Sequence, residues 1–310
     1  MFQVTQAKRE KMKAVIGFIG CSGSGKTGSS LLTAFGMMQE AYPNLTEEEL
    51  WKKIGVIDTE HERSKLHVGL VYGETKIGNF LHINFTPPYT TERYNEAVQV
   101  MKNVGAEVLI IDSLSHNWQG EGGIIETHGE MSGNSFQNWG KLSSETTKLI
   151  KTLTQNNVHI LATLRTKTEY VVEPDAKGKM APRKVGTKPV QKDEMEYEFM
   201  LNFVIDIDHI ADTSKDNTQI FEGNPQKITA EVGRKLYQWL ELGIDVKAEE
   251  ENDRNNLIAQ IKEIASTSED ATKMLSEIEF KTNQKLEDFN MKYLKVALER
   301  LQAFNNKEEK

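Results

Sequence analysis

The chain has 310 residues, of which 38% are hydrophobic, and this length allows one large domain with a smaller one beside it. Its formal net charge of −8 argues against a protein whose whole surface coats nucleic acid, although single segments can still be basic. The single cysteine excludes an internal disulfide framework and fits a reducing cytoplasm. The sequence contains no apolar run of about 18 residues, so we expect no membrane-spanning segment and no membrane partner.

Short, almost wholly apolar segments alternate with helical segments along the first half of the chain. This alternation is typical of a parallel sheet that helices cover on both faces. We expect strands at residues 14–19, 54–57, 81–85, 108–111 and 158–164. We expect helices at residues 26–40, 47–52, 91–104 and 136–155, and a mobile loop at residues 119–134.

The pattern changes after about residue 199. Residues 203–207 and 219–221 are expected to form an antiparallel extension at the edge of the sheet, and residues 236–240 to close the core. The chain then becomes acidic, with apolar residues at helical spacing. The sequence therefore predicts an α/β core over residues 1–247 and a small acidic helical domain over residues 248–310.

The segment from Gly20 to Thr27 matches the pattern G-x-x-x-x-G-K-[ST] in full, and it lies between a predicted strand and a predicted helix. In this motif glycines let successive backbone N–H groups face the phosphates, and the helix N-terminus adds its positive end. We expect Lys26 to reach the β- and γ-phosphates of a nucleotide and Thr27 to bind Mg²⁺. A glycine-rich turn in an unrelated α/β protein is the alternative. The predicted nucleotide-binding residues are Gly20, Ser22, Gly23, Ser24, Gly25, Lys26, Thr27 and Gly28.

Acidic residues follow two of the predicted strands. Asp112 is expected to hold Mg²⁺ through a coordinated water, but Ser113 follows it, so no general base adjoins this carboxylate. Glu60 ends another strand at the same edge of a parallel sheet, and it is our candidate for the base that activates water. A solvated loop acid is the alternative for Glu60. Thr163, late in an apolar strand, is expected to sense the γ-phosphate or to bond to backbone. The predicted catalytic residues are Lys26, Glu60 and Asp112.

These motifs together resemble the RecA/RadA recombinase superfamily. Residues 57–61 are similar to its segment with the catalytic glutamate, and residues 109–113 to its Mg²⁺-binding strand. Residues 162–167 resemble the strand that leads into its second DNA-binding loop. Residues 214–217 resemble a motif by which RadA-type subunits reach a neighbour's nucleotide. The run of residues 164–191 is more closely similar to the Sak-type single-strand annealing ATPases of bacteriophages.

The resemblance implies a RecA-like P-loop fold over roughly residues 12–243, with ATP and Mg²⁺ as ligands. It implies that Lys215 acts in trans, in a homo-oligomer that is a ring or a filament. It also implies single-stranded DNA as a partner and a cytoplasmic location, in the bacterial host if this is a phage protein. The acidic tail lies outside the resemblance. We expect the tail to contact a partner, such as a phage replication or recombination protein, or to regulate self-assembly.

Residues 176–192 contain several basic residues and no acidic one. Their glycines and prolines predict a loop, at the sheet edge where ligands bind. A cationic loop there can follow a phosphate backbone through counterion release, and a solvated lysine-rich loop is the alternative. Trp118, Phe136 and Trp139 flank the other predicted loop and are candidates for stacking on bases, but for at least Trp139, at helical spacing with Leu142, we expect core packing. The predicted DNA-binding residues are Lys177, Lys179, Arg183, Lys184, Lys188 and Lys192.

These expectations favour an ATP-dependent, single-stranded-DNA-binding recombination or annealing protein that hydrolyses ATP to ADP and phosphate. One alternative is a nucleic-acid motor or helicase loader. The other is an ATP-gated interaction module that hydrolyses little ATP and binds a partner through its tail.

Overall fold

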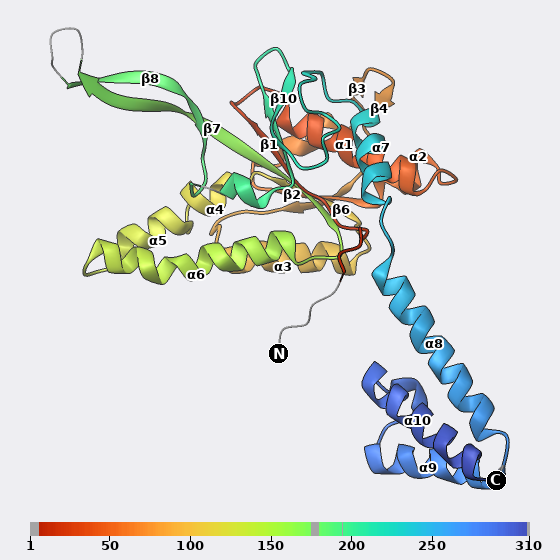
Figure 1. Ribbon diagram of the computed structural model, residues 1–310. Coiled ribbons are helices and arrows are strands. Elements are labelled where there is room, and N and C mark those ends of the chain that lie inside the picture. Colours follow the sequence, from red (N-terminus) through yellow and green to blue (C-terminus); the bar gives the residue numbers. More distant parts are fainter. Residues whose placement is uncertain (1–5, 175–179, 194, 309–310) are drawn as a thin grey trace. The chain divides into compact units, whose positions relative to one another are not determined.

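The computed structural model describes residues 6–174, 180–193 and 195–308 of the chain (Figure 1). It divides into two units. The larger unit is Met12–Glu241, and the smaller comprises residues 242–308 together with residues 6–11. The division thus falls before the predicted boundary at residue 247, and the polar N-terminal residues belong to the smaller unit.

The larger unit is built on an eight-stranded, mainly parallel sheet (Figure 1). Seven strands follow the spatial order β10-β9-β1-β7-β6-β2-β5, and β8 pairs with β7 outside this path. The β9–β10 and β7–β8 pairs are antiparallel, and the other neighbours are parallel. The strands are β1 (Val15–Gly20), β2 (Ile54–Asp58), β5 (Leu81–Asn84), β6 (Val108–Asp112), β7 (His159–Pro174), β8 (Met180–Pro189), β9 (Leu201–Ile205) and β10 (Ala211–Asp216), with a separate ribbon of β3 (Val71–Tyr72) and β4 (Thr75–Lys76).

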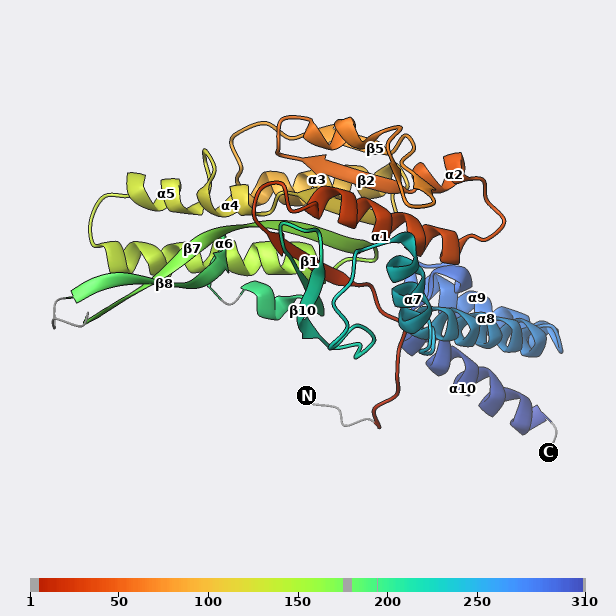
Figure 2. The same ribbon diagram turned by 90° about the horizontal axis from the view of Figure 1, so that it is seen from above.

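Helices cover both faces of this sheet, as Figures 1 and 2 show. One face packs against α1 (Lys26–Ala41), α2 (Glu47–Trp51) and α7 (Ala230–Leu240). The other packs against α3 (Thr91–Asn103) and α6 (Ser135–Thr154). The short helices are α4 (Ser115–Gln119), α5 (Ile124–Glu130), η1 (Arg63–His67) and η2 (Met195–Glu198). The predicted α/β fold with a mainly parallel, helix-covered sheet is confirmed.

The two-sided burial explains why the strands are apolar throughout. In β6, Val108 and Ile110 join the core beneath α1, whereas Leu109 and Ile111 join the core beneath α3 and α6. Successive side chains of a strand point to opposite faces, so a strand covered on both sides must be apolar at every position.

A pair of glycines lets α1 and α7 approach closely. A Cβ atom at Gly36 would lie 1.8 Å from the carbonyl oxygen of Ala230, and one at Gly233 would lie 2.0 Å from that of Thr33. Neither position can carry a side chain without separating the helices. This contact fixes α1, the helix that begins at the phosphate loop, against the rest of the unit.

The basic segment predicted to be a loop is largely strand, so that prediction is wrong. β7 continues past its predicted end at residue 164 to Pro174, and β8 pairs with it from Thr166↔Pro189 to Pro174↔Met180. The pairing supplies the backbone hydrogen bonds that this part of β7 would otherwise lack. Its β-branched and aromatic residues favour the strand: Thr166, Thr168, Tyr170, Val171 and Val172. The result is a β-hairpin that extends from the sheet (Figure 1).

Two further predicted elements differ from the structure. Residues 119–134, predicted to be one loop, contain α5. Residues 219–221, predicted to be a strand, lie outside any strand. The antiparallel edge strand is β10 instead, and its neighbour β9 pairs in parallel with β1. The antiparallel extension therefore exists, but only its last strand is antiparallel. α7 includes residues 236–240, whose Leu236 and Leu240 are buried in the core as predicted.

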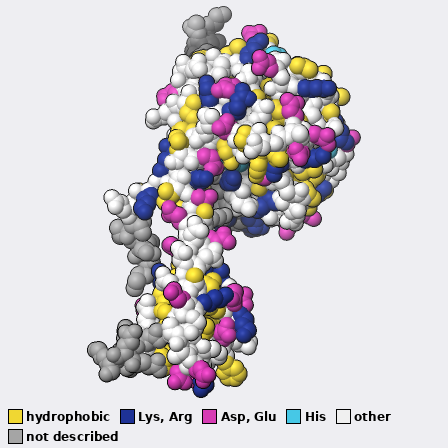
Figure 3. All heavy atoms as spheres, turned by 90° about the vertical axis from the view of Figure 1, so that its right-hand side faces the viewer, with side chains coloured by type: hydrophobic (Ala, Val, Ile, Leu, Met, Phe, Trp, Pro, Cys, Tyr) yellow, Lys and Arg dark blue, Asp and Glu magenta, His cyan; other side chains and the backbone are white. Residues whose placement is uncertain are grey.

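The smaller unit is helical. α8 (Val246–Ala265), α9 (Glu269–Thr282), η3 (Leu286–Asp288) and α10 (Met291–Glu308) enclose a core of their own around Ile261, Phe289 and Leu294. Ile244 exchanges backbone hydrogen bonds with Arg9 and Lys11 within this unit. Within the described ranges no helix combines the length and apolar character that a membrane crossing requires. Acidic and basic side chains are interspersed over both units on the face in Figure 3.

Candidate functional site

The phosphate-loop motif forms a tight turn between β1 and α1. β1 is buried along its length and ends at Gly20, and α1 begins at Lys26. Gly25, the N-cap residue of α1, has a φ of 89°, and a Cβ there would also lie 2.9 Å from Nδ1 of His209. Glycine adopts this left-handed conformation without steric cost, so the chain can turn here and present the first N–H groups of α1.

Lys26 folds back across this loop. Its Nζ donates to the carbonyl oxygen of Cys21 at 2.7 Å. Burial is the main influence on its pKa and lowers it, while the nearby Asp112 carboxylate opposes that effect. An anion in the loop would favour the charged ammonium in the same way, so the site suits a phosphate.

Asp112 is buried at the end of β6 with a hydroxyl on each side. Its Oδ2 accepts from Thr27 Oγ1 at 2.7 Å and its Oδ1 from Thr163 Oγ1 at 2.6 Å. The residue is only 3% exposed, and burial raises the pKa of its carboxyl group. The Thr27 hydroxyl and the Asp112 carboxylate are hard oxygen ligands, the donor type that Mg²⁺ prefers. Because Mg²⁺ usually takes one or two protein ligands beside phosphates and water, these residues fit such an ion.

Glu60 lies at the edge of the same site and pairs with Arg165. Nε of Arg165 donates to Glu60 Oε1 at 2.6 Å, and Nη2 donates to Oε2. The Glu60 side chain is 13% exposed and that of Arg165 is 43% exposed. Sequence reasoning did not identify Arg165, since no local pattern links residues 105 positions apart.

A second residue that sequence reasoning missed, Asp58, holds the turn that carries Glu60. Its buried carboxylate accepts from the backbone N–H of Glu60 at 2.7 Å and from the N–H and hydroxyl of Ser64 at 2.9 and 2.5 Å. His82 Nε2 lies 3.4 Å from the same carboxylate. The signal in the sequence was a second carboxylate at a strand end, two residues before Glu60.

Three cavities meet around these residues. The first, of about 590 Å³, is lined by Gly23, Lys26, Thr27, Glu60, Asp112 and Arg165, among others. A second, of about 550 Å³, is lined by His61, Tyr89, His116, Gln119, Arg165 and Val190, among others. A third, of about 460 Å³, includes Gly25, His67, Tyr72, His209 and Thr229. The first and second share Arg165 and Thr166, and the first and third share Gly25 and His67.

The structure thus brings most of the predicted site residues together. Ser22, Gly23, Gly25, Lys26 and Thr27 line the first cavity with Glu60 and Asp112, and Gly28 lines the third. Gly20 lines a neighbouring cavity beside β10, and Ser24 is buried in the loop. Thr163 reaches Asp112 rather than backbone, and its role as a γ-phosphate sensor stays a prediction.

Lys215 lies apart from this group. It is on β10, and its Nζ donates to the carbonyl oxygen of Tyr197. Lys215 is absent from the lining of the first cavity, within the part of the chain that the structure describes. Its role in trans therefore stays a prediction.

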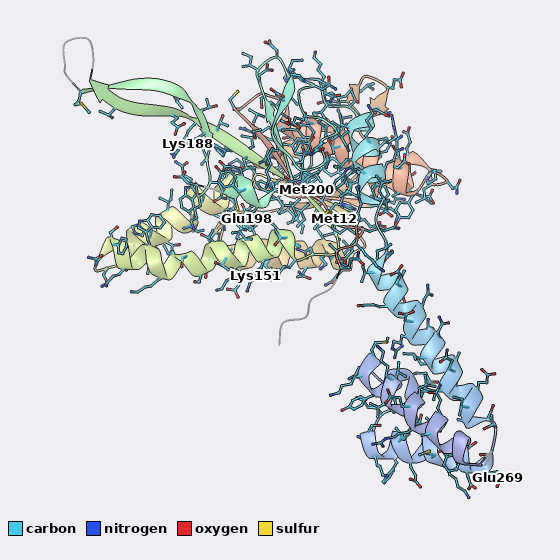
Figure 4. The ribbon with its side chains drawn as sticks, viewed as in Figure 1. Met12, Lys151, Lys188, Glu198, Met200 and Glu269 are labelled. Atoms are coloured by element: carbon cyan, nitrogen blue, oxygen red, sulfur yellow. The ribbon has the colours of Figure 1, made fainter. Side chains whose placement is uncertain are left out.

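The predicted DNA-binding residues fall on or near the hairpin. Lys177 and Lys179 lie outside the described residues, and Arg183 and Lys184 are described in backbone only, as part of β8. Lys188 lies near the root of the hairpin (Figure 4), opposite Lys167, with its Nζ 3.7 Å from Asp193 Oδ1. Lys192 follows β8 and is exposed.

The aromatic residues that flank α5 form a surface cluster. The rings of Trp118 and Trp139 stack with their centroids 5.8 Å apart. The ring of His128 stacks on that of Trp139 with a centroid distance of 4.0 Å. Trp139 is 38% exposed, so core packing was a wrong expectation for it. Phe136 is 87% exposed.

No protein-family model matches this chain, and no curated protein matches it either. The chemistry of the site is therefore what indicates a function.

Proposed function

We propose that this protein is a RecA-like, Mg²⁺-dependent ATPase that binds single-stranded DNA and acts in phage recombination or annealing. The observation that carries the proposal is the first cavity, where a complete phosphate loop, the Thr27–Asp112 pair and Glu60 converge. A glycine-rich turn of an unrelated protein would not require a buried carboxylate and a second acid in the same place.

The predicted site residues have distinct chemical roles in this proposal. The N–H groups at the start of α1 and the ammonium of Lys26 bind the phosphates. Thr27 and Asp112 hold Mg²⁺, which when bound would neutralise charge on the phosphate oxygens. Thr163 orients Asp112 through its hydrogen bond. Glu60 takes a proton from the attacking water as general base.

The third cavity supports a nucleoside triphosphate rather than inorganic phosphate. It adjoins the phosphate cavity at Gly25 and His67 and contains the aromatic pair of His67 and Tyr72. Their rings stack with centroids 5.9 Å apart, and His67 Nδ1 lies 2.7 Å from the Tyr72 hydroxyl. Burial lowers the pKa of His67, which favours its neutral form. A neutral aromatic pair of this kind suits a nucleobase.

The hairpin supports the polymer half of the proposal. The β7–β8 hairpin and the α5–α6 helices extend from the same side of the sheet in Figures 1 and 2. One arm has the basic residues, and the other has the aromatic cluster with the exposed Phe136. Cationic surfaces follow phosphates and exposed aromatic rings stack on bases, which is how single strands are bound without sequence preference.

The first test is ATP turnover, measured alone and with oligo-dT, duplex DNA and RNA of equal length. We expect Mg²⁺-dependent hydrolysis that single-stranded DNA stimulates most. Stimulated unwinding of a duplex would favour a motor or helicase loader instead. Nucleotide binding without turnover under every condition would favour an ATP-gated interaction module.

The second test measures DNA binding by fluorescence anisotropy at several salt concentrations. Three or four basic contacts predict a slope of log K against log salt between about −2 and −3 for a single strand. Replacing Lys179, Arg183, Lys184 and Lys188 with alanine should flatten this slope and retain DNA-free hydrolysis. The matched control replaces four exposed lysines elsewhere, Lys52, Lys262, Lys273 and Lys281. Equal losses in both variants would mean that the hairpin has no special role.

A further inference from the structure

Arg165 occupies the point where β7 leaves the sheet and enters the hairpin. It is the last β7 residue in register with β1, opposite Gly20, and the next residue, Thr166, begins the pairing with β8. Its backbone is held on both sides. Its N–H donates to Ser115 Oγ at 3.0 Å, and its carbonyl accepts from the N–H of Val190 at 2.7 Å. A displacement of the hairpin root therefore acts first on this residue.

The Arg165 side chain engages both oxygens of the Glu60 carboxylate. A general base needs a free carboxylate oxygen that points at the water whose proton it takes. While the guanidinium holds both oxygens in a bidentate pair, the carboxylate faces Arg165, and each oxygen keeps only its remaining lone pair for a water. This pairing makes Glu60 less available as a base than a free carboxylate would be.

The second cavity is also lined by Arg165. His116 lines it, with Nδ1 2.6 Å from the Thr59 hydroxyl and its ring stacked on Tyr89 at 4.9 Å. Burial and the neighbouring Arg165 lower the pKa of His116, which favours its neutral form. The carboxylate of Glu121 also lines the cavity. Among the described residues that line it, Arg165 is the one with a permanent positive charge. An anion that enters this cavity competes with Glu60 for Arg165.

We propose that Arg165 is a positioning residue that holds Glu60 inactive until a phosphodiester of single-stranded nucleic acid, bound at the hairpin root, enters the second cavity and draws the guanidinium away. The inference rests on the proposed ATPase and specifies how its site is regulated. Lys188 and Lys192, near the same root, supply the neighbouring positive charge for the strand.

The test is steady-state ATP hydrolysis by Arg165→Gln with and without oligo-dT. The variant removes the bidentate cation, so the DNA-free kcat should rise up to about fivefold, the order by which a partly exposed ion pair restrains its partner. The KM for ATP should stay unchanged, and stimulation by oligo-dT should fall toward none. Arg165→Lys keeps the charge without the forked guanidinium, so its DNA-free kcat should lie between those of the parent protein and Arg165→Gln.

The matched control is Arg234→Gln, which breaks another Arg–Glu pair, with Glu231 on α7, outside both cavities. It should hydrolyse ATP and respond to oligo-dT as the parent protein does. Circular dichroism checks that each variant is folded, and if Arg165→Gln is unfolded the prediction is judged on Arg165→Lys.

A lower kcat or a higher KM in folded Arg165→Gln would overturn the inference, because Arg165 would then bind the nucleotide itself. An unchanged kcat with full stimulation would overturn it as well. In either case hydrolysis by the parent protein leaves the proposed function intact. A parent protein that never hydrolyses ATP overturns the proposed function and the inference together.

Discussion

The buried His159 predicts that the folded protein loses stability in acid. It begins β7 in the core, with Nδ1 accepting from the N–H of Ala14 at 3.1 Å and Nε2 3.2 Å from the ammonium of Lys13. The Tyr237 ring lies 5.9 Å away. Burial, with a smaller contribution from Lys13, lowers the pKa of His159 from 6.5 to about 3. The folded protein therefore resists taking up a proton that the unfolded chain accepts.

The sign follows from proton uptake. Between pH 6.5 and about 3 the unfolded chain binds a proton at His159 and the folded protein does not, so stability falls as the pH falls. At pH 5 this single residue should reduce the free energy of unfolding by about 2 kcal/mol relative to pH 8. The full difference, at pH values below both pKa values, is about 5 kcal/mol.

The measurement is urea unfolding of the parent protein and of His159→Asn at pH 8 and pH 5. Asparagine keeps an acceptor where Nδ1 stood but does not titrate, so the variant should be less stable at pH 8 because it fills less space. Between pH 8 and pH 5 the free energy of unfolding of the variant should fall by about 2 kcal/mol less than that of the parent protein. Equal losses in the two proteins would refute the reasoning, since carboxylates elsewhere contribute alike to both.

Four other substitutions test the fold and the site. Gly36→Ala should lower the free energy of unfolding by about 2 kcal/mol, measured in urea, because its Cβ would overlap the Ala230 carbonyl. Thr163→Val should cost about 2 kcal/mol through the lost hydrogen bond to Asp112 and raise the Mg²⁺ concentration needed for turnover. Glu60→Gln should bind ATP normally but hydrolyse it about 10²-fold more slowly when oligo-dT is present. Lys26→Ala should fold normally and lose ATP turnover, so normal rates in this variant would contradict the assignment of the loop.

Much of the fold and of the candidate site follows from local sequence. The apolar strand before Gly20, the motif itself and the carboxylates after two other strands all lie within a few residues of one another. A parallel sheet brings the carboxyl ends of its strands to one edge. That rule was enough to predict Glu60 and Asp112 beside the phosphate loop, where the structure has them.

The features that were not predicted depend mainly on contacts between residues far apart in the sequence. The glycines and prolines of β8 disfavour a strand locally, and only pairing with β7 makes one. The Glu60–Arg165 pair joins residues on different strands, and a single arginine after an apolar run gives no sign of its partner. The Asp58 turn was missed for the opposite reason. Asp58 lies only two residues before Glu60, and the sequence does not show which of the two acids holds the turn and which faces the site.

The length of β7 connects the two halves of the proposed function. Along one strand, Thr163 donates to the carboxylate of Asp112, Arg165 pairs with Glu60, and Thr166 begins the hairpin. Upstream, residues 160–164 are fixed by parallel pairing with β1, whereas from Thr166 onward the strand pairs with β8 alone. A phosphate at the hairpin root could therefore draw the Arg165 side chain from Glu60, while the Asp112–Thr163 contact stays in place. Polymer binding would then change the availability of the base without disturbing the residues proposed to hold Mg²⁺.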